Sequence, residues 1–335
     1  MIPVTLAARS LSFWRRVRRM GLGLLLASIV AAAEADGLRA QSIDGFVINV
    51  SDIDRAARFY TNVLGFHADA VVHRGDETER TWDRWTGTRR TVTRTLRLRL
   101  GREQVDLFQF QRPKGRAIPA DSRSTDHWFQ HLAIVVRDID EAYAHLRRWR
   151  VAHVSTGPQT LPGWNARAAG IRAFYFKDPD DHVLELIWFP PDKGDPRWQS
   201  IGSDLFLGID HTAIVVSDTD RSIDFYTRHL GLRVAGESEN WGVEQEHLNQ
   251  VFGARVRITS MRAPAGPAIE FLEYLAPPGG RPRPRDARVQ DLMSWRIRIR
   301  AAPADLAGAR GGGAVPGVLD WLMPDPDGHW LEVVP

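Results

Sequence analysis

Short apolar runs alternate with amphipathic segments along this chain, and the same order of patterns recurs. Residues 46–50 and 213–216 are runs rich in Ile and Val, with the length of buried strands. Each run ends in Ser-Asp, a common start of a helix, and apolar residues then recur every three or four positions, as in 53–64. Gly65 and Gly231 stand where a helix C-cap is expected. The pattern predicts a strand followed by a helix at both places.

These two stretches are copies of one another. Residues 43–70 read IDGFVINVSDIDRAARFYTNVLGFHADA and residues 209–236 read IDHTAIVVSDTDRSIDFYTRHLGLRVAG, with 13 of 28 positions identical and no gap. A fainter copy of the opening strand begins at His131 (HLAIVVRD), and a degraded one begins at Ser294 (SWRIRI). Internal repeats of this kind indicate one structural unit used several times. Four modules are therefore predicted, near residues 43–112, 126–190, 208–276 and 291–335.

Three further strands complete each predicted module. The last strands are expected at residues 105–110, 182–189, 269–275 and 330–334. Two of them follow the tight-turn sequences DPDD at 178–181 and DPDG at 325–328, whose residue types favour hairpin connections. The predicted module is therefore β-α-β-β-β, in an α+β fold.

The motifs SDTDRSIDFYTRHLGL and SDIDRAARFYTNVLGF, with the closing strands DPDDHVLELIWF and DPDGHWLEVV, resemble those of the vicinal oxygen chelate superfamily. That group includes glyoxalase I, methylmalonyl-CoA epimerase, extradiol dioxygenases and the fosfomycin and bleomycin resistance proteins. The resemblance implies four βαβββ modules paired into two cup-shaped glyoxalase-like domains. We expect these domains at 43–190 and 208–335, joined by a Pro/Gly-rich linker at 191–207.

In this superfamily, inward positions on the first and last strand of each module converge on one divalent metal ion. Carrying those positions over gives one set in each copy, each with one histidine and two carboxylates. The implied sets are Gly45, Asp106, His131 and Glu185 in the first copy, and His211, Glu270, Ser294 and Glu332 in the second. Histidine nitrogen and carboxylate oxygen together suit Zn, Fe, Mn or Ni. A metal-free ligand pocket remains an open alternative for either cup.

The resemblance also implies a reaction. A metal ion with open positions can hold two adjacent substrate oxygens and stabilise an enediolate-type intermediate, while a closing-strand carboxylate, Glu332 or Glu185, moves the proton. The expected function is a metal-dependent glyoxalase-like lyase or isomerase acting on a small oxygen-chelating substrate. The alternative is a non-catalytic small-molecule-binding protein of the bleomycin-resistance type. An extradiol-type dioxygenase is disfavoured, because Ser294 stands where that mechanism has its second histidine.

Two polar segments are candidates for the mouth of a cup. In the second copy, residues 244–250 read EQEHLNQ, and we expect Glu246 and His247 to contact substrate, although a solvated loop or short helix explains the segment equally well. In the first copy, residues 80–90 are rich in arginine and tryptophan. They can hold an anionic or planar ligand, or form a solvated face with tryptophans in the core.

Composition narrows the remaining classes. The 335 residues contain no cysteine, which excludes disulfides, thiolate nucleophiles and iron–sulfur clusters. The formal charge is +3, but five arginines precede the first acidic residue, Glu34, so the rest of the chain carries −2. That balance argues against a nucleic-acid partner. The same arginines precede an apolar run and Ala31-Ala32-Ala33, which predicts a signal peptide over 1–33, export, and no stable membrane insertion after its removal. The oligomeric state is left open.

Overall fold

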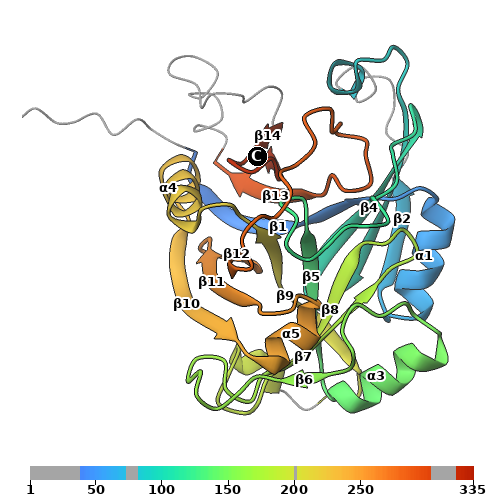
Figure 1. The fold of residues 1–335 in the computed structure, drawn as a ribbon. Coiled ribbons are helices and arrows are strands. Elements are labelled where there is room, and N and C mark those ends of the chain that lie inside the picture. The colour runs from blue at the N-terminus through green and yellow to red at the C-terminus, as the bar shows by residue number, and fades with distance from the viewer. Residues whose placement is uncertain (1–37, 73–81, 200–201, 303–321) are drawn as a thin grey trace, which may run out of the picture. The chain divides into compact units, whose positions relative to one another are not determined.

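The computed structural model describes residues 38–72, 82–199, 202–302 and 322–335 (Figure 1). The leader over 1–33 lies outside these residues, so export stays a prediction. None of the helices in the described ranges has the length and hydropathy needed to cross a membrane.

The elements follow the predicted order of one strand, one helix and further strands. Modules one and two contain β1 (Ala40–Asn49), α1 (Ile53–Asn62), β2 (His67–Val72), β3 (Val92–Leu100), β4 (Glu103–Arg112), then β5 (Gln130–Val136), α3 (Ile139–Arg148), β6 (Gln159–Thr160), β7 (Arg172–Lys177) and β8 (Val183–Trp188). A 3-10 helix (Pro196–Gln199) follows. Modules three and four contain β9 (Phe206–Val215), α4 (Thr219–Leu230), β10 (Arg233–Trp241), α5 (Val243–Asn249), β11 (Arg255–Arg262), β12 (Ala268–Ala276), then β13 (Arg296–Ala301), β14 (Leu322–Pro324) and β15 (Trp330–Val334). Residues 303–321 of the fourth module lie outside the described ranges.

The helix ends follow the sequence signals, with one exception. The carboxylates of Asp52 and Asp218 accept hydrogen bonds from backbone N–H groups in the first turns of α1 and α4. Gly231 ends α4 with φ +67°, a left-handed conformation that glycine adopts without strain. Helix α1 instead ends at Asn62 with Val63 as its C-cap, so Gly65 is not the C-cap, although the φ of +71° at Gly65 still turns the chain toward β2.

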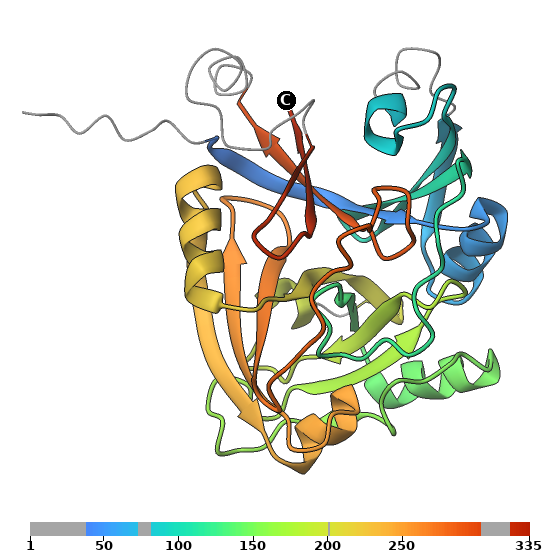
Figure 2. The ribbon, with the colours of Figure 1, turned by 45° about the horizontal axis from the view of Figure 1, so that its top comes forward.

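The strands form two sheets that combine modules from both copies. The seven-stranded sheet has the order β14-β15-β13-β1-β4-β3-β2, and the eight-stranded sheet has the order β10-β11-β12-β9-β5-β8-β7-β6. Figure 2 shows β1, in blue, beside β13, in orange-red. The first module therefore pairs with the fourth, and the second with the third. The expectation that 43–190 and 208–335 each supply one complete cup is wrong, because β5 pairs antiparallel with β9 across the linker.

Two reciprocal ion pairs join the loops that lead into β5 and β13. Arg116 of the first copy binds Asp291 of the second at 2.7 Å, and Arg281 of the second binds Asp126 of the first at 2.7 Å. The glycine before each arginine lies against the other loop, where an added Cβ would stand 2.0 Å or less from a carbonyl oxygen. These close approaches hold the two copies in their exchanged arrangement.

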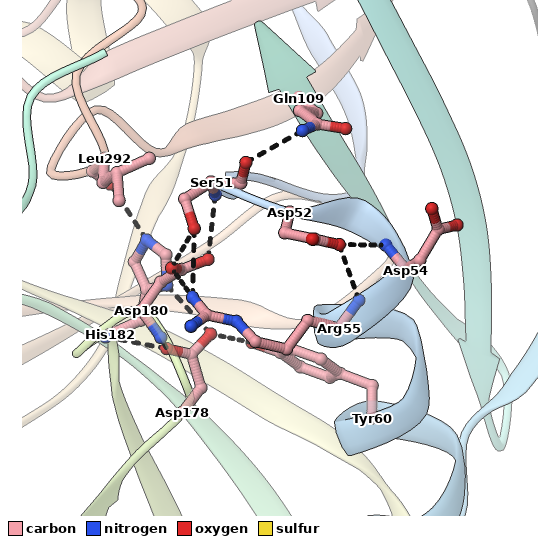
Figure 3. A network of polar contacts seen from close by, with 10 residues as sticks. All are labelled: Ser51, Asp52, Asp54, Arg55, Tyr60, Gln109, Asp178, Asp180, His182 and Leu292. Carbon is pink, nitrogen blue, oxygen red and sulfur yellow. Dashed lines mark hydrogen bonds and ion pairs between the residues drawn. The ribbon is translucent and has the colours of Figure 1, made fainter. Parts of the chain in front are cut away.

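A polar latch links the two modules within each copy across the sheets (Figure 3). Asp180, in the turn before β8, accepts hydrogen bonds from the backbone N–H of Ser51 at 2.9 Å and from Arg55. Asp178 accepts one from the Tyr60 hydroxyl at 3.2 Å and lies 2.9 Å from Nδ1 of His182. The second copy repeats the latch with Ser217, Arg221, Tyr226, Asp325 and Asp327. The DPD turns therefore have two roles: they connect two strands of a hairpin, and their aspartates link one sheet to the helix that packs on the other.

The convex faces of both sheets contribute to one apolar core. It includes Ile48 and Leu98 from the seven-stranded sheet and Ile134, Phe174 and Ile214 from the eight-stranded sheet. Helix α1 packs on β2–β4, α3 on β7 and β8, and α4 on β10–β12 (Figure 1). Because the helices cover this side, the concave faces are left for polar chemistry.

Candidate metal centre

Four polar side chains meet on the concave face of the eight-stranded sheet. His131 on β5 and His211 on β9 lie on adjacent antiparallel strands, with His211 opposite Ala133. Glu185 on β8 also lies beside Ala133, and Glu270 on β12 lies beside Ala213. Side chains at alternate positions of a strand share one face, so all four point inward. We call this group, His131, Glu185, His211 and Glu270, the histidine cup.

The ligand atoms of the histidine cup are close together. Nε2 of His131 lies 3.1 Å from Oε2 of Glu185 and 3.5 Å from Nε2 of His211. Nε2 of His211 lies 3.5 Å from the same Glu185 oxygen and 3.4 Å from Oε2 of Glu270. Three of the residues are almost fully buried, whereas the Glu270 side chain is 24% exposed. Glu270 is therefore the member most accessible from the cavity.

The outer nitrogens of the two imidazoles differ in their surroundings. Nδ1 of His211 lies 3.0 Å from Oδ2 of Asp210, whose other oxygen accepts a hydrogen bond from the Trp198 indole at 3.1 Å. This carboxylate fixes the ring and increases its basicity, as an outer partner of a ligand histidine does. Nδ1 of His131 is buried and has no hydrogen-bond partner. Only the His211 imidazole is thus oriented by a hydrogen bond at its outer nitrogen.

The two carboxylates of the histidine cup differ in the direction of their pKa shifts. Burial alone would raise the pKa of Glu185, but the charge of His131 and hydrogen bonds from both histidines outweigh it and lower that pKa to about 2. Burial, with the charges of Asp210 and Glu185, raises the pKa of Glu270 despite the opposing charge of His211. Burial opposes charge on His211 too, yet Glu270, Asp210 and Glu185 raise its pKa well above 6.5. Glu185 is the better ligand and Glu270 the better proton acceptor.

The histidine cup has the chemistry of a divalent metal site. Two imidazole nitrogens and two carboxylate oxygens form a donor set that Zn, Fe, Mn or Ni accepts. Ligand atoms of His131, Glu185 and His211 lie within 4.8 Å of one another. Buried carboxylates need a cation, and within these four residues a positive charge arises only when an imidazole is protonated. A divalent ion would supply that charge, so the residues fit the group.

A cavity of about 620 Å³ opens over the centre. This volume is that of an ordinary small-molecule site. The wall is apolar along Ile258 and Leu272, with polar groups at Tyr175 and Gln245. Burial and the charge of Glu185 raise the pKa of Tyr175 well above 10, so its hydroxyl keeps its proton. Oε1 of Gln245 is buried without a partner and can accept a hydrogen bond from a bound hydroxyl group.

The polar segment of the second copy does reach the cavity, but through other residues than expected. It forms α5, and Gln245 and Leu248 line the cavity while Glu246 and His247 do not. Positions three apart share one face of a helix, so the buried face of α5 excludes His247, which is exposed. The assignment of Glu246 and His247 as substrate contacts is therefore corrected to Gln245. The spacing of Gln245 and Leu248 is the signal that identifies this face.

The equivalent positions of the seven-stranded sheet hold arginines and carboxylates. Arg298 lies 2.7 Å from Asp106 and 3.3 Å from Glu332, and Arg97 lies 2.9 Å from Asp106. Arg296 lies 3.4 Å from Glu332. We call Arg97, Asp106, Arg296, Arg298 and Glu332 the arginine cup. Asp106 and Glu332, expected as metal ligands, and Glu332, expected as a catalytic residue, are here ion-pair partners on another sheet from both histidines.

The alignment of the fourth module is also corrected, by two residues. In the other modules the closing carboxylate lies beside the residue two positions after the histidine position, as with Glu185 and Ala133. Glu332 lies beside Arg298, so the histidine position is Arg296 and not Ser294. Gly45 takes that position in the first module, with φ +148° and no room for a Cβ, which would stand 2.4 Å from a backbone oxygen.

Aromatic side chains pack against the arginine cup. Trp82, Phe108 and Phe110 form a buried cluster, and the guanidinium of Arg296 stands 4.5 Å from the Phe108 ring centre and 5.0 Å from that of Trp82. Arg296 is fully buried, and burial lowers its pKa to about 10. The tryptophan-rich segment 80–90 thus contributes Trp82 to the core, as one of its two interpretations predicts. Arg80 lies outside the described residues.

Comparisons with known proteins agree with this architecture. A family model described as the Glyoxalase/Bleomycin resistance protein/Dioxygenase superfamily matches residues 42–186 and 208–333, which confirms the resemblance found in the motifs. A 2-epi-5-epi-valiolone epimerase from an Actinomyces species is 34% identical over 145 residues, covering 42% of this chain and 75% of that protein. Its isomerase activity agrees with the expected enzyme class.

Solved structures show the same fold. Glyoxalase I from Zea mays superposes with a TM-score of 0.53 at 18% identity, over 88% of this chain and 92% of that chain. A putative dioxygenase from Bacillus subtilis superposes with a TM-score of 0.52 at 15% identity, over 89% and 86%. The α+β architecture of βαβββ modules paired into two cups is therefore confirmed.

Proposed function

The chain belongs to the Glyoxalase/Bleomycin resistance protein/Dioxygenase superfamily, and from that premise we propose that it is a metal-dependent epimerase or isomerase. Its reaction moves a proton at a carbon beside a carbonyl group of a small substrate that presents two adjacent oxygens. The observation that carries the proposal is the convergence of His131, Glu185, His211 and Glu270 beneath a cavity of about 620 Å³. The activity named for the Actinomyces relative, an epimerase, supports the same reaction class.

His131, Glu185, His211 and Glu270 would hold the metal ion. When bound, the ion supplies Lewis-acid polarisation of the substrate oxygens, which acidifies the neighbouring C–H group. Asp210 orients His211 from behind, at 3.0 Å from its Nδ1. The four strands that carry the ligands are central in the sheet, so the site is built on rigid elements.

Glu270 takes and returns the proton in this proposal. Its side chain is the most exposed of the four and faces the cavity, so it can reach a bound substrate. Glu185 is held by both histidines and keeps the charge of the site fixed. The protonated hydroxyl of Tyr175 lines the same cavity and can donate a hydrogen bond to a substrate oxygen. Apolar Ile258 and Leu272 limit the access of water.

A dioxygenase is the second candidate, and one observation favours it. His131, His211 and Glu185 alone form a set of two histidines and one carboxylate, the ligand set of many iron(II) oxygenases. The sequence argument against this class relied on Ser294, which the structure places outside the ligand position. Glu270, the second carboxylate and fourth candidate ligand of the group, favours the epimerase, because it occupies a position that oxygen chemistry needs open.

The first experiment measures metal content. The purified chain is treated with a chelator and then titrated with Zn, Mn, Ni, Co and Fe(II), with the bound metal measured by mass spectrometry. We expect one ion per chain, and a loss of that ion in His131→Ala and in His211→Ala. Absence of uptake for every metal contradicts the proposal, and leaves the non-catalytic binding protein as the function to pursue.

The second experiment tests the proton transfer assigned to Glu270. In deuterated water, proton NMR follows exchange at the carbon beside the carbonyl of small hydroxyketones. We expect Glu270→Gln to slow exchange by about 10²–10⁴-fold, the usual contribution of a general base. Glu237→Gln is the control, because Glu237 lines the same cavity but is paired with Arg257 at 3.1 Å. Equal exchange in both variants, or oxygen uptake with a catechol instead, contradicts the epimerase.

A further inference from the structure

We propose that the substrate of the histidine cup is an anion, whose phosphate or carboxylate group is bound by Arg262 with Arg167 beside it. This inference rests on the proposed function, and it adds the charge of the substrate to the reaction class. It differs from the epimerase proposal in the residues that carry it, since neither arginine belongs to the four-residue centre. A neutral substrate would leave both guanidinium groups without an anion in hydrogen-bonding contact.

Arg262 lies on the inner face of the sheet, next to the metal centre. Ser260 on β11 is the register partner of Glu270 on β12. Arg262 is two positions further along β11, on the same face, and lines the cavity. Two positions of a strand correspond to about 7 Å, so a group bound to Arg262 stands only a few bonds from oxygens held at the centre. The anchor and the reacting oxygens therefore suit one small molecule.

Arg167 reaches the same end of the cavity from the loop before β7. Its Nη1 lies 3.6 Å from the place where a Cβ would stand on Gly236. Gly236 is the register partner of Ser260, the residue two positions before Arg262. Both residues line the cavity, together with Arg262. Two cationic side chains thus approach one end of the cavity from different modules.

The carboxylates at this end are already paired with other cations. Asp195 lies 3.5 Å from Arg197, and Glu237 lies 3.1 Å from Arg257. Asp210 is hydrogen-bonded with His211 and Trp198, and the charge of Arg262 also helps to lower the pKa of Asp210. Among the residues that the structure describes, the side chains of Arg262 and Arg167 make no hydrogen bond and no ion pair within 4.0 Å. Once a divalent ion balances Glu185 and Glu270, these two guanidinium groups leave the cavity with a positive charge that a bound anion would neutralise.

The experiment compares two probes with the same hydroxyketone group and different charge. Dihydroxyacetone phosphate carries the anion, and dihydroxyacetone does not. Binding to the metal-loaded chain is measured by isothermal titration, and the absorption of the Co(II)-substituted chain reports whether each probe reaches the centre. We expect the phosphate to bind at least about tenfold more tightly, the usual effect of hydrogen bonds to a charged group. A third probe, 5-hydroxy-4-oxopentanoate, replaces the phosphate with a carboxylate and shows which of the two anions is preferred.

Variants assign the preference to a residue. Arg262→Gln should remove the preference for the anionic probe and leave the affinity for dihydroxyacetone unchanged, whereas Arg262→Lys should keep part of it. Arg233→Gln is the matched control: Arg233 is the register partner of Arg262 on β10 and does not line the cavity, so the same change of net charge should have no effect. An equal loss in Arg233→Gln would show a general field effect and overturn the assignment.

The outcomes distinguish this inference from the proposed function. If the chain takes up metal but binds dihydroxyacetone as well as its phosphate, the anionic substrate is wrong and the epimerase stands. If the chain takes up no metal, the proposed function is wrong, and the same titrations on the metal-free chain decide whether Arg262 still prefers the anion. If none of the probes binds with or without metal, the inference is overturned.

Discussion

At equivalent strand positions, the two cups of this molecule carry different side chains, and we assign different roles to them. In the histidine cup, the first strands of two modules carry imidazoles and the last strands carry glutamates, around a cavity. In the arginine cup, the first strands carry Gly45 and Arg296, and the carboxylates Asp106 and Glu332 are bound by guanidinium groups. The residues of one cup could hold a cation from solution, whereas the other cup contains its cations as side chains.

The ion pairs of the arginine cup indicate that equivalent strand positions can serve a structural role without a metal ion. Replacing a ligand histidine by an arginine puts a permanent charge at the position of the ion and satisfies the same carboxylates. Trp82 and Phe108 then pack against Arg296. A histidine at Gly45 is disfavoured by the φ of +148° and the close backbone oxygen at this position. The arginine cup therefore has a structural role, and of the two cups only the histidine cup has a set of candidate metal ligands.

The largest expected difference between the cups is in the result of neutralising equivalent carboxylates, Glu185 in the histidine cup and Glu332 in the arginine cup. Glu185→Gln should abolish stoichiometric metal binding and proton exchange, by more than the roughly 10–100-fold that outer partners of a metal site contribute. Glu332→Gln should leave metal content and exchange unchanged, because Glu332 contacts Arg296 and Arg298 instead. Both variants are compared by metal analysis and by the exchange assay. Loss of metal in Glu332→Gln would make the two cups equivalent and contradict the comparison.

The next prediction concerns the stability of the folded chain, which we expect to depend on the ion pairs of the arginine cup. Asp106 is 1% exposed and binds Arg97 and Arg298, so Asp106→Asn removes the shorter of the two ion pairs of the buried Arg298 and leaves it only the 3.3 Å contact with Glu332. We expect the free energy of unfolding to fall by about 3–5 kcal/mol in urea titrations, with one metal ion still bound per chain. The control is Asp69→Asn, which breaks the exposed pair with Arg99 at 2.8 Å and should cost less than about 1 kcal/mol. Equal losses in the two variants would show that the arginine cup is not a structural element.

Some features of the histidine cup can be predicted from the sequence, and others cannot. His131, Glu185, His211 and Glu270 are all predicted as ligands by the resemblance to the superfamily, which implies inward positions on the opening and closing strands of the repeat. Their grouping into one set per copy is predicted wrongly, because four modules with similar opening strands do not determine which strands pair. The contacts that decide it, such as Arg116 with Asp291, lie in loops between the modules where the repeat gives no pattern.

The error at the fourth module has a related cause. A shift of two residues along a strand keeps the same side chains on the same face, so alternation of apolar and polar positions cannot detect it. Ser294 and Arg296 therefore fit the pattern equally well, and only the pairing of Arg298 with Glu332 decides between them. Arg262 was not predicted either, since an arginine in a strand reveals neither its face nor its lack of a partner.

The smallest effect concerns the latch that ties the cups together through His182. This residue is buried, with Nδ1 2.9 Å from Asp178 and Nε2 2.9 Å from the carbonyl oxygen of Leu292. Burial alone would lower the pKa of His182, but the charge and hydrogen bond of Asp178 outweigh it and raise that pKa above 6.5. The folded chain therefore binds a proton that the unfolded chain releases between about pH 6.5 and the raised pKa.

The latch consequently contributes its full stability below about pH 6.5 and loses it as the pH rises through the folded pKa of His182. Denaturant titrations of the metal-free chain across this range should show a free energy of unfolding that falls with pH, by at most about 1.4 kcal/mol per pH unit for one proton. His182→Gln should remove that slope. Tyr60→Phe, which deletes only the hydroxyl that binds Asp178 at 3.2 Å, should lower stability by about 1 kcal/mol at every pH and keep the slope. A slope that persists in His182→Gln would place the titrating group elsewhere, and the tie between the cups would then not depend on the charge of this histidine.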